Sequence, residues 1–116
     1  MVQNRSGIRK QSAVVVSPVT GAAAALYNIT PGRTAIIRRI MWTNACGAGS
    51  NLSLGQGLAG AFAAVLPPIV TLTGLDGQLE EGDFPNVEIQ WTAALPAITF
   101  ESTVLGISVT IEVEEI

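Results

Sequence analysis

The carboxyl-terminal stretch of the chain alternates strictly between apolar and polar residues, and this pattern constrains its conformation more than any other in the sequence. The apolar positions are Leu105, Ile107, Val109, Ile111 and Val113, and the positions between them are Gly106, Ser108, Thr110, Glu112 and Glu114. A period of two residues sustained over nine or more positions predicts a β-strand with one face in a hydrophobic core.

A second region, residues 27–55, predicts a β-hairpin. Pro31 and Gly32 stand at the second and third positions of residues 30–33, where a type II turn favours them. A long strand is predicted next, over residues 34–44. Its alternation places Ile36, Arg38, Ile40 and Trp42 on one face and Ala35, Ile37, Arg39, Met41 and Thr43 on the other. Because both faces are largely apolar, the strand is expected at the centre of a two-layer core, or half in the core and half in a subunit interface.

Further strands are predicted at roughly 8–12-residue spacing. They cover residues 11–17, 22–29, 51–55, 69–73, 87–93 and 98–103. In the strand at 22–29, Ala23, Ala25, Tyr27 and Ile29 are expected on one face, opposite Ala22, Ala24, Leu26 and Asn28. Residues 55–66 fit either a loop with one helical turn or a bulged strand, whereas residues 74–77 predict a turn and residues 78–86 an acidic loop.

The fold class follows from these elements. About eight strands without a convincing amphipathic helix predict an all-β protein, an antiparallel β-sandwich of the jelly-roll kind, over residues 21–116. Residues 1–20 are polar and cationic at first and are predicted to form an extended arm, whose β-branched run at 14–16 is suited to docking on a neighbour.

The composition limits the classes of function. The 116 residues suit one domain, and only 13% of them are charged against 48% hydrophobic, so part of the surface is expected to be covered by a partner. Neither a membrane-spanning run nor the apolar core of a signal peptide is recognised. Cys46 is the only cysteine and histidine is absent, which excludes an intrachain disulfide and the common zinc sites within one chain.

The charges are divided along the chain. All six cations fall within the first 39 residues, and all nine acids lie from Asp76 onward. One interpretation is that copies pack front to back or that the basic arm reaches an acidic neighbour. The other is that the sandwich brings the two halves together, so that they neutralise each other internally. The six cations do not form a phosphate-binding pattern, so nucleic acid is not an expected partner.

Two motifs raise the possibility of a ligand. Residues 55–60 match the glycine pattern of dinucleotide-binding loops, with Asp76 roughly twenty residues on, but Pro67 follows too soon for a crossover helix. The segment is therefore expected to be a glycine-rich loop, without a cofactor. Asp76, Glu80, Glu81 and Asp83 fit either a hard-cation site or, as we expect, a solvated acidic loop.

The remaining candidates have ordinary structural interpretations as well. Cys46 is expected to be a small turn residue rather than a reactive thiol. Trp42 and Trp91 are expected to be core or interface anchors, the alternative being a sugar-binding face. Asn28-Ile29-Thr30 matches a glycosylation sequon but is expected to be a strand end beside a turn. Without histidine or a nucleophile motif, no enzymatic activity is expected.

Three stretches together resemble the small β-sandwich structural proteins of tailed bacteriophages. They are residues 27–40, residues 43–54 and the final strand at 108–115, and Arg38-Arg39-Ile40 and Thr43-Asn44 match most closely. The resemblance covers about residues 22–116, whereas residues 55–60 and the arm have no counterpart. It implies a virion component: a capsid decoration, or cement, protein that sits on the head as a trimer.

On this resemblance, the chain is expected to be made in the bacterial cytoplasm and to bind copies of itself and the major capsid protein on the capsid surface. The residues expected to contact a partner are Arg5, Arg9, Lys10, Val14, Val15, Val16, Arg38, Arg39 and Trp42. The alternative is a tail or fibre module that recognises host-surface glycan through Trp42 or Trp91 and the acidic loop.

Overall fold

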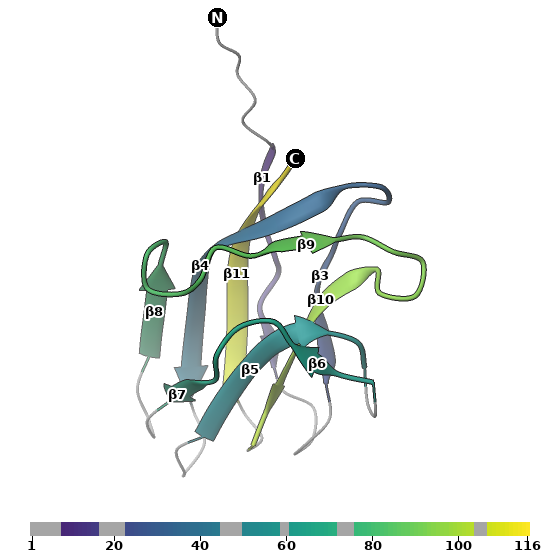
Figure 1. Cartoon of the computed structure of the whole chain (residues 1–116). Coiled ribbons are helices and arrows are strands. Elements are labelled where there is room, and N and C mark those ends of the chain that lie inside the picture. The colour runs from purple at the N-terminus through teal and green to yellow at the C-terminus, as the bar shows by residue number, and fades with distance from the viewer. Residues whose placement is uncertain (1–7, 17–22, 45–49, 59–60, 72–75, 104–106) are drawn as a thin grey trace, which may run out of the picture.

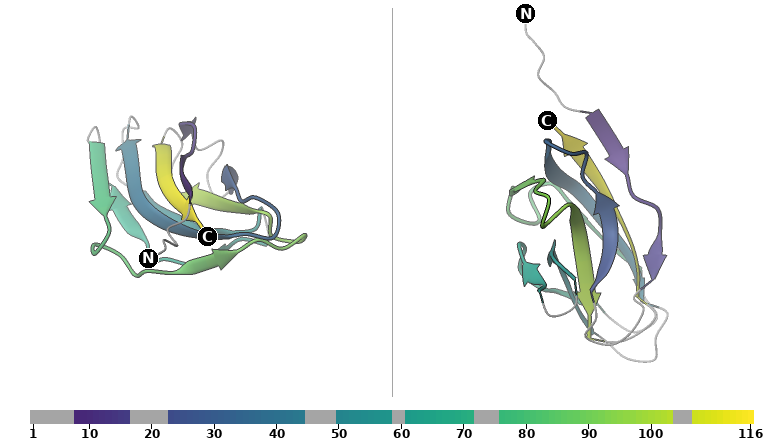
Figure 2. Two further views of the ribbon diagram at one scale, coloured as in Figure 1. Left: turned by 90° about the horizontal axis from the view of Figure 1, so that it is seen from above. Right: turned by 90° about the vertical axis from the view of Figure 1, so that its right-hand side faces the viewer.

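The chain forms two antiparallel β-sheets packed face to face (Figures 1 and 2). The computed structural model describes residues 8–16, 23–44, 50–58, 61–71, 76–103 and 107–116, and no helix occurs among them. The first sheet contains β1 (Ile8–Gln11), β2 (Val15–Val16), β4 (Thr34–Asn44), β8 (Asp76–Glu80), β9 (Glu88–Gln90) and β11 (Ile107–Glu115). The second contains β3 (Ala24–Asn28), β5 (Ser50–Gln56), β6 (Ala63–Ala64), β7 (Ile69–Thr71) and β10 (Ala97–Ser102). The predicted all-β antiparallel sandwich is confirmed.

The strand order is that of a jelly roll. Among the described residues there are eleven strands, but three long strands are each interrupted once: β1 and β2 both pair with β11, β6 and β7 with β5, and β8 and β9 with β4. When each interrupted strand is counted once, eight remain. Their order is β1/β2–β11–β4–β8/β9 in one sheet and β3–β10–β5–β6/β7 in the other, which is the double Greek key of a jelly roll.

The hydrophobic core fills the space between the sheets. The inward residues of β11 are fully buried, as the alternation predicts: Ile107, Val109, Ile111 and Val113. They form one cluster with residues of the second sheet, among them Leu52, Leu54, Ile98 and Phe100. In β9, Ile89 is buried while Glu88 and Gln90 are exposed. Leu105 and Gly106 lie outside the described residues.

The turn and the strand predicted at residues 30–44 are confirmed, but the predicted faces of the strand are wrong. Arg33 donates its backbone N–H to the Thr30 carbonyl at 2.9 Å, and Gly32 has the positive φ of 81° that a type II turn needs. In β4, Glu112 lies opposite Arg39 and Val113 opposite Ile37, so Arg38 is an extra residue, a β-bulge.

The bulge in β4 reverses the alternation halfway along the strand. Ala35 and Ile37 point into the core before the bulge, and Ile40 does so after it, although the period of two places Ile37 and Ile40 on opposite faces. Arg38 and Arg39 consequently share the outer face of the first sheet, where both meet carboxylates of β11.

A second bulge corrects the predicted faces of β3. Ile98 pairs with Tyr27 and Thr99 with Ala25, which leaves Leu26 without an opposite residue. Leu26 and Tyr27 are consequently both buried, while Ala25 is exposed.

Residues 76–80 form a strand, and not the turn and loop that the sequence predicts. Asp76 pairs with Thr43 and Gly77 with Trp42, so β8 extends the first sheet at its edge. A glycine is favoured at position 77 because a Cβ there would lie 2.1 Å from a ring atom of Trp42. The acidic turn is therefore shorter than predicted and begins after Glu80, with Gly82 at a φ of 96°.

Residues 55–66 contain a hairpin, which resolves the two predicted alternatives in favour of a strand. Chain reversal after β5 includes a hydrogen bond from Ala61 N–H to the Leu58 carbonyl, and β6 then pairs antiparallel with β5. No crossover helix follows the glycine pattern in the described part of this segment. Nor does the structure contain, among its described residues, a helix long and apolar enough to cross a membrane.

Candidate functional site

The described part of the predicted arm is the outermost strand of the first sheet. Residues 8–16, named here the edge segment, run antiparallel to β11, with Arg9 opposite Glu114 and Gln11 opposite Glu112 (Figure 2). Ser12 fixes the register, because its N–H donates to the Ile111 carbonyl at 2.9 Å and its hydroxyl accepts the Ile111 N–H at 2.9 Å. Arg5 lies outside the described residues.

The edge segment presents apolar side chains to solvent. The exposed fraction is 67% for Val14, 54% for Val16 and 52% for Ile8, whereas Val15 is partly buried against the core. The structure places Val14 and Val16 at the surface. That these valines contact a partner stays a prediction from the sequence.

The cations near the edge segment meet glutamates of the same chain. Arg38 makes the tightest set: its Nε and Nη2 lie 2.9 and 2.8 Å from Glu114 Oε1, and its Nη1 lies 3.0 Å from Glu81 Oε2. Arg39 is 3.6 Å from Glu112 and 3.7 Å from Glu80. The bulged Arg38 thus joins β11 to the turn after β8, and the next residue, Arg39, joins β11 to β8 itself.

The two cations of β1 continue this network. Arg9 lies 3.8 Å from Glu81 and 3.9 Å from Glu114, and Lys10 Nζ lies 3.5 Å from Glu115. These ion pairs support the interpretation in which the basic and acidic halves of the chain neutralise each other. They also engage Arg9, Lys10, Arg38 and Arg39, the four described cations that the sequence assigns to a partner.

Glu115 has the most deeply buried carboxylate of this network, with a side chain only 1% exposed against 11% for Glu114. Its oxygens accept a hydrogen bond from the Tyr27 hydroxyl, one from the Thr30 N–H at 2.9 Å and one from the Thr30 hydroxyl at 2.7 Å. Lys10 adds the positive charge. Three hydrogen bonds from residues 27–30 and one ammonium group from the edge segment therefore converge on one carboxylate.

The environment of Glu115 decides its charge. Burial by itself raises the pKa of Glu115, but the hydrogen bonds from Tyr27 and Thr30 and the charge of Lys10 outweigh it, and the pKa falls from its ordinary 4.5 to about 2. Burial, then the hydrogen bond to Glu115 and its negative charge, raise the pKa of Tyr27. Glu115 is thus an ionised acceptor and Tyr27 a neutral donor at neutral pH.

Glu115 is not among the residues that the sequence pattern singles out. The signal was present, because Glu115 has the same parity as Ile107, Val109, Ile111 and Val113 and therefore points to the inner side of the strand. A carboxylate at an inward position requires partners, and those partners lie about ninety residues earlier in the sequence.

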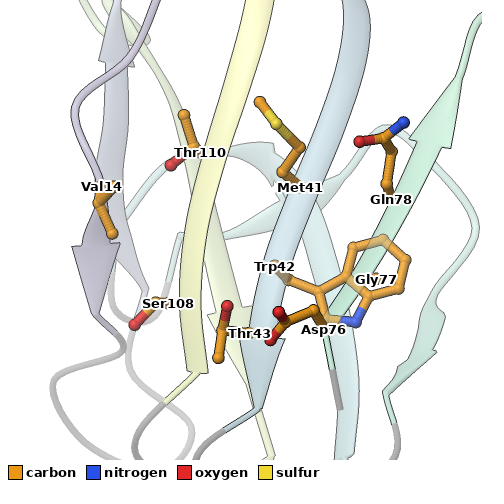
Figure 3. A pocket seen from close by; sticks show the side chains of 9 residues that line it. All are labelled: Val14, Met41, Trp42, Thr43, Asp76, Gly77, Gln78, Ser108 and Thr110. Carbon is orange, nitrogen blue, oxygen red and sulfur yellow. The ribbon is translucent and has the colours of Figure 1, made fainter.

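A shallow hollow of about 260 Å³ lies on the outer face of the first sheet, beside the edge segment (Figure 3). Its lining includes Val14, Met41, Thr43, Asp76, Gln78, Ser108 and Thr110. The indole of Trp42 lies over Gly77 and packs against the core cluster, as Trp91 does elsewhere, which agrees with the expected role of core anchors; a partner contact through Trp42 stays a prediction.

The acidic residues do not gather into a cation site within the described part of the chain. Glu80 and Glu81 face Arg39 and Arg38, and Asp83 accepts the Glu80 N–H at 2.9 Å. Asp76 stands apart from them at the start of β8. Cys46 lies outside the described residues.

No protein-family model matches this sequence, and no curated protein matches it either. Among solved structures, the chain is similar to a protein from the work titled "Bacillus endospore appendages form a novel family of disulfide-linked pili". The two share 15% sequence identity, the match covers 98% of this chain and 94% of that one, and the TM-score is 0.42.

Proposed function

We propose that this chain is a structural subunit of a bacteriophage particle, a capsid decoration protein that stabilises the head by contacts made through the edge segment. The observation that carries the proposal is the distribution of exposed apolar side chains. Among the described residues, five large hydrophobic side chains are exposed, and three of them, Ile8, Val14 and Val16, belong to the nine-residue edge segment.

A surface of this kind favours a protein partner. Apolar side chains concentrated at one edge of a sheet lose water when a partner covers them. The outer side of β1 and β2 also offers backbone N–H and C=O groups to an added strand, because no described strand pairs with it there. The sequence resemblance to phage β-sandwich proteins supplies the identity of the assembly, and the low charge content agrees with a surface that is covered in use.

In this proposal the partners are copies of the chain, arranged as trimers, and the major capsid protein. The chain is made in the bacterial cytoplasm and works on the capsid surface. The ion-pair network has a structural role, which is to hold the edge segment in register.

The location in the particle is the direct test. Immunogold electron microscopy with antibodies against this chain, on virions from a lysate that produces it, should label heads. Labelling confined to tails or fibres, together with glycan-array binding that is lost on Trp91→Ala, would favour the glycan-binding alternative and overturn the proposal. Virions without label would also overturn it.

The contact surface is tested separately. Val14→Asp with Val16→Asp should weaken co-sedimentation with capsids lacking the chain roughly tenfold or more, because two apolar side chains would no longer be buried in the contact. Leu58→Asp is the matched control, since Leu58 has the same 54% exposure as Val16 but lies beside the second sheet, away from the edge segment. Equal losses for both variants would contradict the assignment of the contact to the edge segment.

A further inference from the structure

We propose that the edge segment also pairs with β11 of a second copy of this chain, so that two copies exchange their amino-terminal strands. This pairing joins copies two at a time, and it depends neither on the capsid assignment nor on the trimeric arrangement proposed with it.

The segment is held by backbone pairing and ion pairs more than by burial. All four residues of β1 are exposed, and among residues 8–16 only Ser12 is buried and Val15 partly so. The ion pairs of Arg9 span 3.8–3.9 Å on the outer face of the sheet, and the ammonium group of Lys10, whose side chain is 40% exposed, reaches the buried Glu115 at 3.5 Å. Ion pairs made by such exposed cations contribute little each and weaken in salt, so the segment can separate with the loss of the buried contacts of Ser12 and Val15 alone, while the rest of the core stays closed.

The surface that the segment leaves is preformed. Glu115 keeps all three of its hydrogen bonds and loses only the ion pair with Lys10, because Tyr27 and Thr30 belong to β3 and to the turn after it. The carboxylate therefore stays ionised and fixed in position, and only an ammonium group is missing from it. Along the same edge, Ile111 regains a free N–H and a free carbonyl. An unpaired strand edge is a template for another strand.

A second copy supplies the complement in full. Its Lys10 matches Glu115, its Arg9 lies opposite Glu114, and its Ser12 matches Ile111, because the pairing between copies repeats the pairing within one chain. Exchange of identical elements is a low-cost route to dimers, since every native contact is recovered. Each Glu115 site in the exchanged dimer is completed by Lys10 of the partner subunit.

Mixed single-cysteine variants distinguish exchange from pairing within one chain. One variant carries Gln11→Cys and the other Glu112→Cys, both with Cys46→Ser. Ser12 and Ile111 are hydrogen-bonded partners, so Gln11 and Glu112 form the neighbouring non-hydrogen-bonded pair, whose closer side chains suit a disulfide. The variants are refolded together at about 1 mM, comparable to the effective concentration of a tethered segment, and oxidised with glutathione disulfide.

The expected product is a covalent heterodimer, whose yield rises with protein concentration. A chain carrying both cysteines should give an internally cross-linked monomer when diluted, which confirms the cysteine geometry. The matched control mixes Gln11→Cys with Thr43→Cys, an exposed position on β4 that pairs with β11 and β8 but not with β1. A heterodimer yield no higher than this control, from a chain whose double variant does cross-link, would overturn the proposal.

Kinetics test the role of the ion pairs. Lys10→Met weakens the closed and the exchanged pairing equally, so it should speed exchange roughly two- to fivefold without changing the final heterodimer yield. Raising sodium chloride from about 50 mM to about 500 mM should act in the same direction. An exchange rate that responds to neither change would contradict the claim that these ion pairs hold the segment.

Discussion

Replacement of Glu115 by glutamine should lower the free energy of unfolding by about 3 kcal/mol at neutral pH. The pKa of Glu115 falls from 4.5 to about 2 in the folded chain, and each pKa unit corresponds to about 1.4 kcal/mol of differential stabilisation. Because the carboxylate is almost fully buried, solvent screening reduces this value little. Glutamine removes the charge and also turns an amide N–H₂ toward groups that are themselves donors, Tyr27 and Thr30.

The pH dependence separates this electrostatic contribution from a simple packing defect. A carboxyl group with a depressed pKa in the folded state stabilises fully above its unfolded pKa of 4.5, and the stabilisation disappears as the pH falls through about 2. At pH 3 more than half of it should be gone. The difference between wild type and Glu115→Gln should therefore be about 2 kcal/mol smaller at pH 3 than at pH 7.

Urea unfolding followed by tryptophan fluorescence at both pH values measures this difference, since Trp42 and Trp91 pack against the core. Glu88→Gln is the matched control: Glu88 is exposed on β9, and its replacement should change stability by less than about 0.5 kcal/mol at either pH. A Glu115→Gln deficit that is the same at pH 3 and pH 7 would refute the argument from the buried carboxylate.

Two further substitutions test the first sheet. Gly77→Ala should lower the free energy of unfolding by about 1–3 kcal/mol and alter the fluorescence of Trp42, because the new Cβ would lie 2.1 Å from the indole ring. A melting temperature and an emission spectrum equal to those of the wild type would contradict this packing. Arg38→Met should lower the free energy of unfolding in urea by about 2 kcal/mol, because it removes the guanidinium from the largely buried Glu114. Removal of the exposed partner of Arg38 by Glu81→Gln should lower it by less than about 1 kcal/mol. Equal losses for the two variants would contradict the greater weight given to the Arg38–Glu114 pair.

Local signals in the sequence were sufficient for much of the fold. The turn at 30–33 depends on Pro31 and Gly32 alone, and the bounds of β4 and the inner face of β11 follow from the turn and from uninterrupted alternation. The class of the fold, an antiparallel sandwich, follows from the number and spacing of such strands. These features require no knowledge of which strand pairs with which.

The errors arise where pairing decides the outcome. The bulges at Leu26 and Arg38 are defined by the opposite strand, so a period of two counted along one strand cannot reveal them. Asp76 and Gly77 resemble a turn, but the indole of Trp42 covers the glycine and β4 pairs with both residues. Nonlocal packing outweighs local propensity at these positions.

Only part of the candidate site could be predicted from the sequence. Arg9, Lys10, Val14 and Val16 were singled out from the sequence, and the structure places all four on the edge segment. The carboxylate that receives Lys10 was missed, because its burial depends on hydrogen bonds from Tyr27 and Thr30, which the sequence separates from Glu115 by more than eighty residues.

The bulge in β4 bears on how chains of this kind would vary in length. In a regular strand, loss of one residue turns everything beyond it to the opposite side. Loss of Arg38 would leave the faces of β4 unchanged, because Arg38 is the extra residue of the bulge. Ile37, Arg39 and Ile40 would then alternate without interruption, and every apolar side chain would stay on its present face of the sheet. A homologous sequence one residue shorter at this point would retain the same core and differ chiefly in lacking the guanidinium that links Glu114 to Glu81.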